Sequence, residues 1–192
     1  KQDWAVLEYI QHPSDDVVRI ALDQSGWAIR YITNSSEELQ LRAVETQYDV
    51  LQYIANPSER VQMAAVKSNY LSLRYIQNPT LDILKAAVLQ DPQAMRQITN
   101  LDLDTVVELL KVSTLILGYV PKQIGLTVDM VRQIITEMIA NPAVEDRYVR
   151  ELVSNPAIGG RQSTWPIDIL SLVDAYGSIE AKKIAIDQYL LY

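Results

Sequence analysis

Residues 53–69 read Tyr-Ile-Ala-Asn-Pro-Ser-Glu-Arg-Val-Gln-Met-Ala-Ala-Val-Lys-Ser-Asn, and the first part of the chain is built on this pattern. The Tyr-Ile pair at its start recurs every 22 residues. Its positions are Tyr9-Ile10, Tyr31-Ile32, Tyr53-Ile54 and Tyr75-Ile76, and Gln97-Ile98 and Tyr119-Val120 fall on the same spacing. A fixed period of this length is typical of stacked supersecondary repeats.

A turn signal follows each pair, most clearly at Asn56-Pro57-Ser58. Asn is a favoured helix N-cap, and Pro suits the first helical position because its missing N–H costs nothing there. Glu59 stands three residues after Asn56, as in a capping box. We therefore predict that each Asn begins a helix, with His12 as the substitute cap in the first unit.

Each 22-residue unit predicts two short helices, which in the clearest unit span about 49–55 and 57–68. Apolar residues three and four positions apart give each helix one buried face. One position of the second helix holds alanine in four successive units: Ala21, Ala43, Ala65 and Ala87. This column indicates a close helix crossing with no room for a larger side chain.

The pattern predicts an all-α fold, an α-solenoid of short helix pairs in residues 1–120 with a helical C-terminal cap in residues 121–192. The spacing decays after Leu110, and Asn141-Pro142 and Asn155-Pro156 lie only 14 residues apart. We expect a loop at 159–164 and two last helices near 166–176 and 179–191. Solenoids need such a cap over the open end of the stack.

Residues 53–69 resemble a short-repeat family of unknown function found in proteins of large DNA viruses and tailed phages, and residues 31–43 and 75–88 match it less fully. The pattern is more loosely similar to leucine-rich-variant and HEAT-like repeats. The resemblance covers residues 4 to about 110. It implies a stack of helix pairs and a viral setting, and it implies no catalytic residues.

Composition excludes several classes of function. The net charge of −7 argues against a nucleic-acid-binding surface, which is usually basic. The chain has no cysteine, which excludes disulfides and thiolate metal sites. No apolar run approaches the roughly 18 residues that a membrane span needs. Acids gather at the predicted helix starts, where the helix dipole favours them; a dedicated acidic recognition face is the alternative. We expect no cofactor, no metal and no membrane contact, in a cytoplasmic protein (host cytoplasm if viral).

The tyrosine column is the leading candidate site. Each tyrosine either packs between neighbouring units with its hydroxyl on a backbone group, or belongs to a ladder of anchors for a partner. Tyr and Arg are enriched at interface hot spots, and the variable column beside the tyrosines indicates a solvent-facing surface. The predicted partner-binding residues are Tyr9, Tyr31, Tyr53, Tyr75, Arg30, Arg74, Arg96 and Trp27. Trp165 is either a further anchor or pins the cap to the array.

We expect no enzymatic activity. With no cysteine and one histidine, a nucleophile and base would depend on His12 alone. Gly159-Gly160 lacks the Lys-Ser/Thr that completes a phosphate-binding loop. The expected function is therefore a protein-binding repeat module with an unidentified protein partner. In a viral setting this would be a host-interacting factor, such as an inhibitor of a host defence enzyme.

Two alternatives remain open. The chain could be a virion structural protein or assembly scaffold whose array ends stack head to tail. It could also be a nucleic-acid-processing enzyme on a HEAT-like scaffold, which the acidic balance disfavours.

Overall fold

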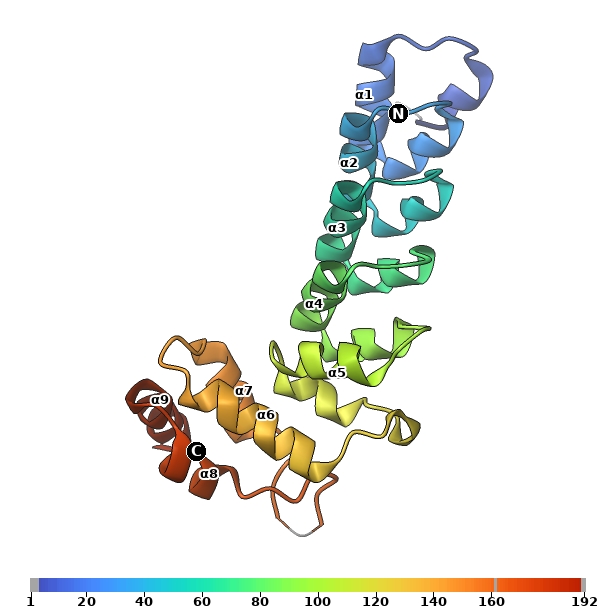
Figure 1. Cartoon of the computed structure of the whole chain (residues 1–192). Helices are drawn as coiled ribbons and strands as arrows, with labels where there is room; N and C mark the ends of the chain where they lie inside the picture. The colour runs from blue at the N-terminus through green and yellow to red at the C-terminus, as the bar shows by residue number, and fades with distance from the viewer. Residues whose placement is uncertain (1–3, 161, 191–192) are drawn as a thin grey trace. The chain divides into compact units, whose positions relative to one another are not determined.

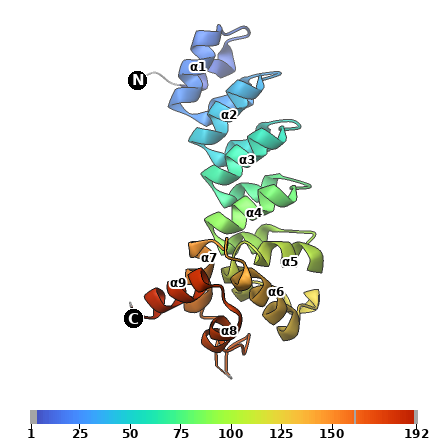
Figure 2. The same cartoon turned by 60° about the vertical axis from the view of Figure 1, so that its left-hand side comes forward.

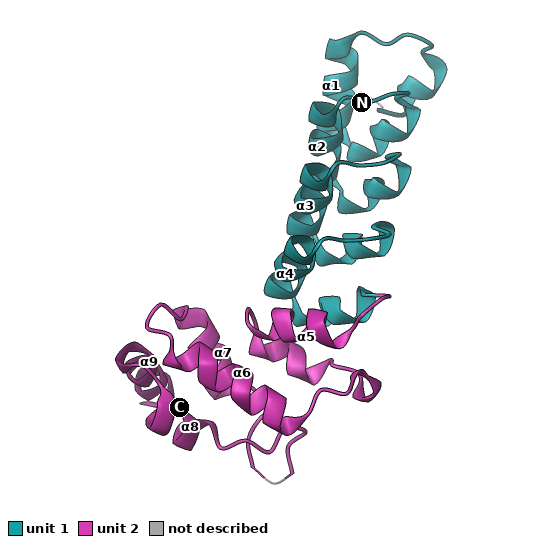
Figure 3. Ribbon diagram, viewed as in Figure 1, with its two compact units in different colours: residues 1–98 teal, residues 99–192 magenta. Residues whose placement is uncertain are grey.

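The computed structural model describes residues 4–160 and 162–190, and within these ranges the chain is helical, with no strand. It divides by packing into two compact units, residues 1–98 and 99–192 (Figure 3). The sequence predicts a boundary between the repeats and the cap at residue 120, because the 22-residue period ends there. That boundary stays a prediction. No helix within the described ranges has the length and apolar character needed to cross a membrane.

In the first unit, short 3-10 helices alternate with α-helices. The 3-10 helices are η1 (Trp4–Tyr9), η2 (Gly26–Tyr31), η3 (Tyr48–Tyr53), η4 (Tyr70–Tyr75) and η5 (Pro92–Gln97). The α-helices are α1 (Asp15–Gln24), α2 (Glu37–Thr46), α3 (Glu59–Ser68) and α4 (Leu81–Gln90). Neighbouring α-helices contact one another in one row and neighbouring 3-10 helices contact one another in a second row (Figures 1 and 2). The rows bury their apolar columns against each other.

The caps of the α-helices differ from the sequence prediction, which was wrong about Asn. Ser58 is the N-cap of α3, and its hydroxyl accepts from the Val61 N–H at 3.3 Å. Asn56 precedes the helix in the left-handed region, with φ of 50°. Asn enters that region more easily than most residues, so it turns the chain before the cap. His12 is not a cap either, since Ser14 takes that position.

The predicted capping box at Glu59 was also wrong, because Glu59 is the first residue of α3. Its carboxylate instead accepts from the hydroxyl of Thr80, the N-cap of α4, at 2.7 Å. Glu37, the first residue of α2, likewise accepts from the Ser58 hydroxyl. The cap hydroxyl therefore joins its own helix to the preceding one.

The second unit contains helices of unequal length and irregular connections. Its elements are α5 (Leu103–Leu110), η6 (Thr114–Gly118), η7 (Lys122–Ile124), α6 (Val128–Ala140), α7 (Asp146–Ser154), α8 (Ile169–Tyr176) and α9 (Ile179–Leu190). Helix α7 contacts η6, α8 and α9, and α6 contacts α8. Buried Ile135, Ile139, Tyr148 and Leu152 belong to this core.

The expected loop at 159–164 is turn and bend where it is described, and residue 161 lies outside the described residues. An isolated bridge pairs Ile158 with Trp165 across it. Trp165 is buried, and its indole N–H donates to the Leu117 carbonyl at 3.1 Å. Trp165 therefore fastens this loop to η6 and is not a solvent-facing anchor.

The double role of the cap hydroxyl can be tested with two serines. Ser58→Ala removes the cap bond and the bond to Glu37, so we expect it to lower the free energy of unfolding by about 1–2 kcal/mol. Ser14→Ala is the matched control, because the Ser14 side chain makes no cap hydrogen bond. Urea unfolding of both variants should show a loss for Ser58 alone; equal losses would contradict the account.

Candidate protein-binding edge

The four tyrosines of the predicted column each occupy the last position of a 3-10 helix, at the ends of η1 to η4. We call this surface the tyrosine edge: Tyr9, Tyr31, Tyr53 and Tyr75, with the neighbouring Arg30 and Arg74. Its members differ in burial. Tyr9 is 81% exposed and Tyr53 46%, whereas Tyr31 and Tyr75 are half-buried. The column is thus neither wholly core nor wholly surface.

Tyr31 lies in a small cluster of aromatic and charged side chains. The rings of Tyr31 and Trp4 lie 6.4 Å apart, and the guanidinium of Arg30 lies 4.6 Å from the Tyr31 ring centroid and 5.8 Å from that of Trp4. The Tyr31 hydroxyl accepts from Arg30 and donates to the Glu8 carboxylate at 3.2 Å. The bond to Tyr31 raises the pKa of Arg30, which stays charged. This hydroxyl thus pairs with side chains, contrary to the backbone partner that we considered.

Trp27 of η2 packs on Tyr53 of η3, with ring centroids 5.6 Å apart in an edge-to-face arrangement. Such aromatic pairs contribute about 0.5–1.5 kcal/mol beyond their buried area. Along the sequence, Tyr53 follows Trp27 by one 22-residue repeat period plus about one turn of helix. An aromatic residue from one unit therefore covers the tyrosine of the next, which the sequence columns alone did not reveal.

The remaining predicted residues contribute exposed positive charge. Arg74 is exposed, and its Nε donates to the Leu71 carbonyl at 3.1 Å. Arg96 is exposed near the end of η5. Of the predicted set, the structure brings Arg30 to Tyr31 and Trp27 to Tyr53.

Two grooves open beside the tyrosine edge, between successive turns of the first unit. The first, of about 500 Å³, lies between residues 11–19 and 31–39 and is lined by Tyr31. The second, of about 420 Å³, lies between residues 54–62 and 75–78 and is lined by Tyr75. His12, Asp15, Arg19 and Glu38 give the first groove mixed charge, whereas no charged residue lines the second.

Three acidic residues of the first unit, Asp23, Glu37 and Glu59, each bond to a side chain of the next α-helix or of its N-cap. Across residues 4–160 and 162–190, no three His, Cys, Asp or Glu side chains are grouped so that they could hold a metal ion. Asp23 pairs with Arg42 of the next α-helix, and that hydrogen bond lowers the pKa of the Asp23 carboxyl. The Asp23–Arg42 pair and the bonds of Glu37 and Glu59 to the N-cap hydroxyls thus give some of the acidic residues a structural role.

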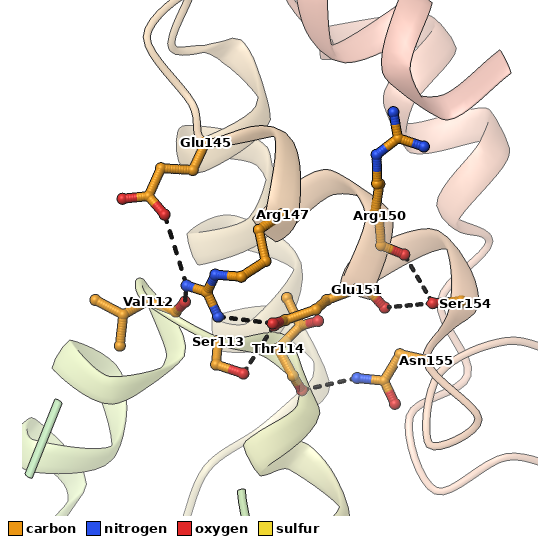
Figure 4. A network of polar contacts seen from close by, with 9 residues as sticks. All are labelled: Val112, Ser113, Thr114, Glu145, Arg147, Arg150, Glu151, Ser154 and Asn155. Carbon is orange, nitrogen blue, oxygen red and sulfur yellow. Dashed lines mark hydrogen bonds and ion pairs between the residues drawn. The ribbon is translucent and has the colours of Figure 1, made fainter. Parts of the chain in front are cut away.

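A second polar constellation lies in the second unit, between α7 and the start of η6 (Figure 4). The Glu151 carboxylate accepts from Arg147 at 2.7 Å and from the Ser113 hydroxyl at 2.8 Å. Arg147 also donates to the Val112 carbonyl at 2.8 Å. Sequence reasoning missed this network, since its partners lie 35 and 38 residues apart and off the 22-residue period.

The Glu151 network serves packing. A serine beside a carboxylate resembles part of a nucleophile system, but Ser113 is buried and Arg147 compensates the Glu151 charge. A substrate therefore has no access to the Ser113 hydroxyl. Burial also raises the pKa of the Tyr148 hydroxyl on the same helix, so that side chain stays neutral.

Asn155 completes the attachment of α7. Its amide donates to the Thr114 carbonyl at 2.7 Å, and its side-chain oxygen accepts from the Ala157 N–H at 2.9 Å. Asn141 makes the equivalent turn bond to the Ala143 N–H at 2.9 Å, and it is exposed. The two Asn-Pro motifs of this unit thus follow helices α6 and α7, and only one reaches across to another element.

The chain matches no family model, and neither a curated protein nor a solved structure is similar to it. The conclusions below therefore rest on the residues and their geometry.

The Asn-Pro motifs allow a paired test of the buried bond. Asn155→Ala leaves the Thr114 carbonyl without its side-chain donor, so we expect it to cost about 1–3 kcal/mol more than Asn141→Ala. Both variants lose the same turn bond, which cancels in the comparison. The measurement is urea unfolding of the two proteins. Equal costs would mean that the bond to Thr114 adds nothing.

Proposed function

We propose that the chain is a short α-solenoid that binds a protein partner along its tyrosine edge. The observation that carries the proposal is the exposed aromatic and cationic character of this edge: Tyr9 is 81% exposed, and Arg30 and Arg74 are exposed at the ends of η2 and η4. Exposing several large aromatic side chains to water in one region is unfavourable in free energy for a monomer. Such side chains are typical of interface anchors.

The element bounds support the solenoid arrangement. The α-helices α1 to α5 begin at residues 15, 37, 59, 81 and 103, and η2 to η5 begin at 26, 48, 70 and 92. Each start is 22 residues after the one before it. The N-caps of α3 and α4 also make the same two hydrogen bonds, one to their own helix and one to the first glutamate of the preceding helix. Repeated contacts between neighbours are the property that defines a solenoid.

The edge offers a partner two kinds of contact. Tyr9 and Tyr53 present apolar rings with a polar tip, which suits the centre of an interface. The grooves beside Tyr31 and Tyr75 offer polar side chains that can fix orientation. The partner is a protein, because the overall charge of −7 repels nucleic-acid phosphates.

In the viral setting that the resemblance implies, the partner is a host protein, and the chain would act as a host-interacting factor such as an inhibitor of a host defence enzyme. The scaffold alternative has one observation in its favour: an apolar cleft of about 220 Å³ between α8 and α9, lined by exposed Leu170, Ile186, Tyr189 and Leu190.

Photo-crosslinking tests the edge directly. With p-benzoylphenylalanine in place of Tyr9, irradiation in host extract should yield one crosslinked host protein. Tyr53→Ala in the same chain should lower that yield at least about tenfold, as loss of a hot spot does. The control places the crosslinker at Lys67, an exposed residue of α3.

The proposal predicts no host protein at the Lys67 position. Equal capture at both positions, or no effect of Tyr53→Ala, would contradict the edge as the binding surface. Crosslinks between copies of the chain would favour the scaffold alternative instead.

A further inference from the structure

The middle of the tyrosine edge contains positive charge and no acid. In three successive units, the stretch from the residue before the tyrosine to the N-cap of the next α-helix holds only two charged residues, Arg30 and Arg74. The stretches are residues 30–36, 52–58 and 74–80. We call them together the acid-free strip. The strip stands out because the whole chain has a net charge of −7.

Acidic residues border the strip on its other sides. Within the same units, Glu37, Glu59 and Asp82 belong to the first turns of α2, α3 and α4, just beyond the strip. In the flanking units, Glu8 takes the position equivalent to Arg30, and Asp102 takes the position equivalent to the N-cap Thr80. The surface that attracts an anionic group is therefore limited to three units of the first row.

Both arginines of the strip are exposed, and each is held by one neighbour. Arg30 lies 4.6 Å from the Tyr31 ring centroid and donates to the Tyr31 hydroxyl. The Arg74 Nε donates to the Leu71 carbonyl at 3.1 Å. A guanidinium has five N–H donors, so these bonds orient the two side chains and leave donors for a ligand. The planar guanidinium is well suited to bind a carboxylate with two parallel hydrogen bonds.

The separation of the two arginines decides the kind of ligand. Helix η2 contacts η3, and η3 contacts η4, in one row (Figure 1). Packed helices lie roughly 8–10 Å apart, so Arg30 and Arg74 are on the order of 16–20 Å apart. One phosphate or one carboxylate cannot reach both. An extended polypeptide advances about 3.3 Å per residue, so two acidic residues about five or six positions apart can.

The side chains between the arginines match a polypeptide. Asn56, Gln77 and Asn78 are exposed, and their amides offer both donors and acceptors to a peptide main chain. Tyr53, 46% exposed, presents an aromatic ring between the two arginines. A nucleic-acid duplex has one phosphate per about 3.4 Å on each strand, so most of its phosphates would have no arginine to pair with here. The strip therefore favours a polypeptide with few, separated acids.

We propose that the acid-free strip binds an extended acidic segment of the partner, in which two carboxylates about six residues apart pair with Arg30 and Arg74. The proposal rests on the function proposed above, because it names the chemistry of the partner at the tyrosine edge. Uncharged residues between the two acids contact Tyr53 and the amide side chains. The acids that border the strip repel the same segment elsewhere, which fixes its register.

The probes are three synthetic nonapeptides. One has two glutamates six positions apart, a second has the same composition with the glutamates adjacent, and a third has glutamine in place of both. Each is titrated into the nitrogen-15-labelled full chain. Binding is followed by NMR through the side-chain Nε–H signals of Arg30 and Arg74, and the dissociation constant Kd is fitted from the shifts.

We expect the spaced peptide to shift both arginine signals. The adjacent-glutamate peptide should bind about two- to fivefold more weakly, because it loses one exposed ion pair, and the glutamine peptide about tenfold more weakly, because it loses both. The double variant Arg30→Gln, Arg74→Gln should raise the Kd of the spaced peptide about tenfold. The matched control is Arg60→Gln, Arg132→Gln, which removes the same charge from exposed arginines outside the strip and should leave the Kd nearly unchanged.

Three results would overturn the proposal: no shift at either arginine, equal binding of the three peptides, or equal weakening in the two double variants. An oligothymidylate that binds at Arg30 and Arg74 more tightly than the spaced peptide would also overturn it, because the strip would then take a polynucleotide. Crosslinking at Tyr9 does not require an acidic ligand. Capture of a host protein there, with failure of the peptides, would therefore keep the proposed function and reject this inference alone.

Discussion

The packing of the first unit depends on one constraint: each of its α-helices has a buried alanine where a neighbouring element approaches closely. Ala21, Ala43, Ala65 and Ala87 are all buried. The carbonyl of each also accepts the N–H of the C-cap residue that ends its α-helix, as in the bond from Asn69 to Ala65 at 2.9 Å. At the second of these positions Gly26 comes so near the Ala43 carbonyl that a Cβ would clash with it. Small residues at this crossing let the two rows close over their apolar columns.

From that contact the remaining features of the first unit follow. With the rows held at one spacing, the cap hydroxyl of one helix reaches the first glutamate of the preceding helix, and Trp27 reaches Tyr53. The tyrosines at the ends of the 3-10 helices are then left partly exposed at one edge.

The period in the sequence located the helices well, since apolar columns and turn signals recur together. Helix α3 ends at Ser68, where the sequence placed its end. The cap could not be located from composition, because Asn56 and Ser58 are both good N-caps and only the positive φ of Asn56 separates them. The Glu151 network was not predictable, because its residues meet through packing of α7 on η6 and not through the period.

The tyrosine column was predicted as a site, and the structure divides its members. Tyr31 is held by Trp4, Arg30 and Glu8, whereas Tyr9 is free of such packing and largely exposed. Of the two interpretations considered from sequence, packing describes Tyr31, whereas partner binding stays a proposal, for which the exposed Tyr9 is the clearest candidate. A partner would meet a preformed edge, in which Arg30 and Tyr31 are already oriented by their neighbours.

The alanine contact can be tested by a pair of neighbouring substitutions in α3. Ala65→Leu should lower the free energy of unfolding by about 1–3 kcal/mol, because the closely packed crossing has no room for the larger side chain. Ala64→Leu is the matched control: Ala64 is half-buried, and its column already holds Ile20 and Arg42. Urea unfolding that shows a loss for Ala65→Leu and little change for Ala64→Leu is the result that the account predicts. Equal stability of the two variants would contradict it.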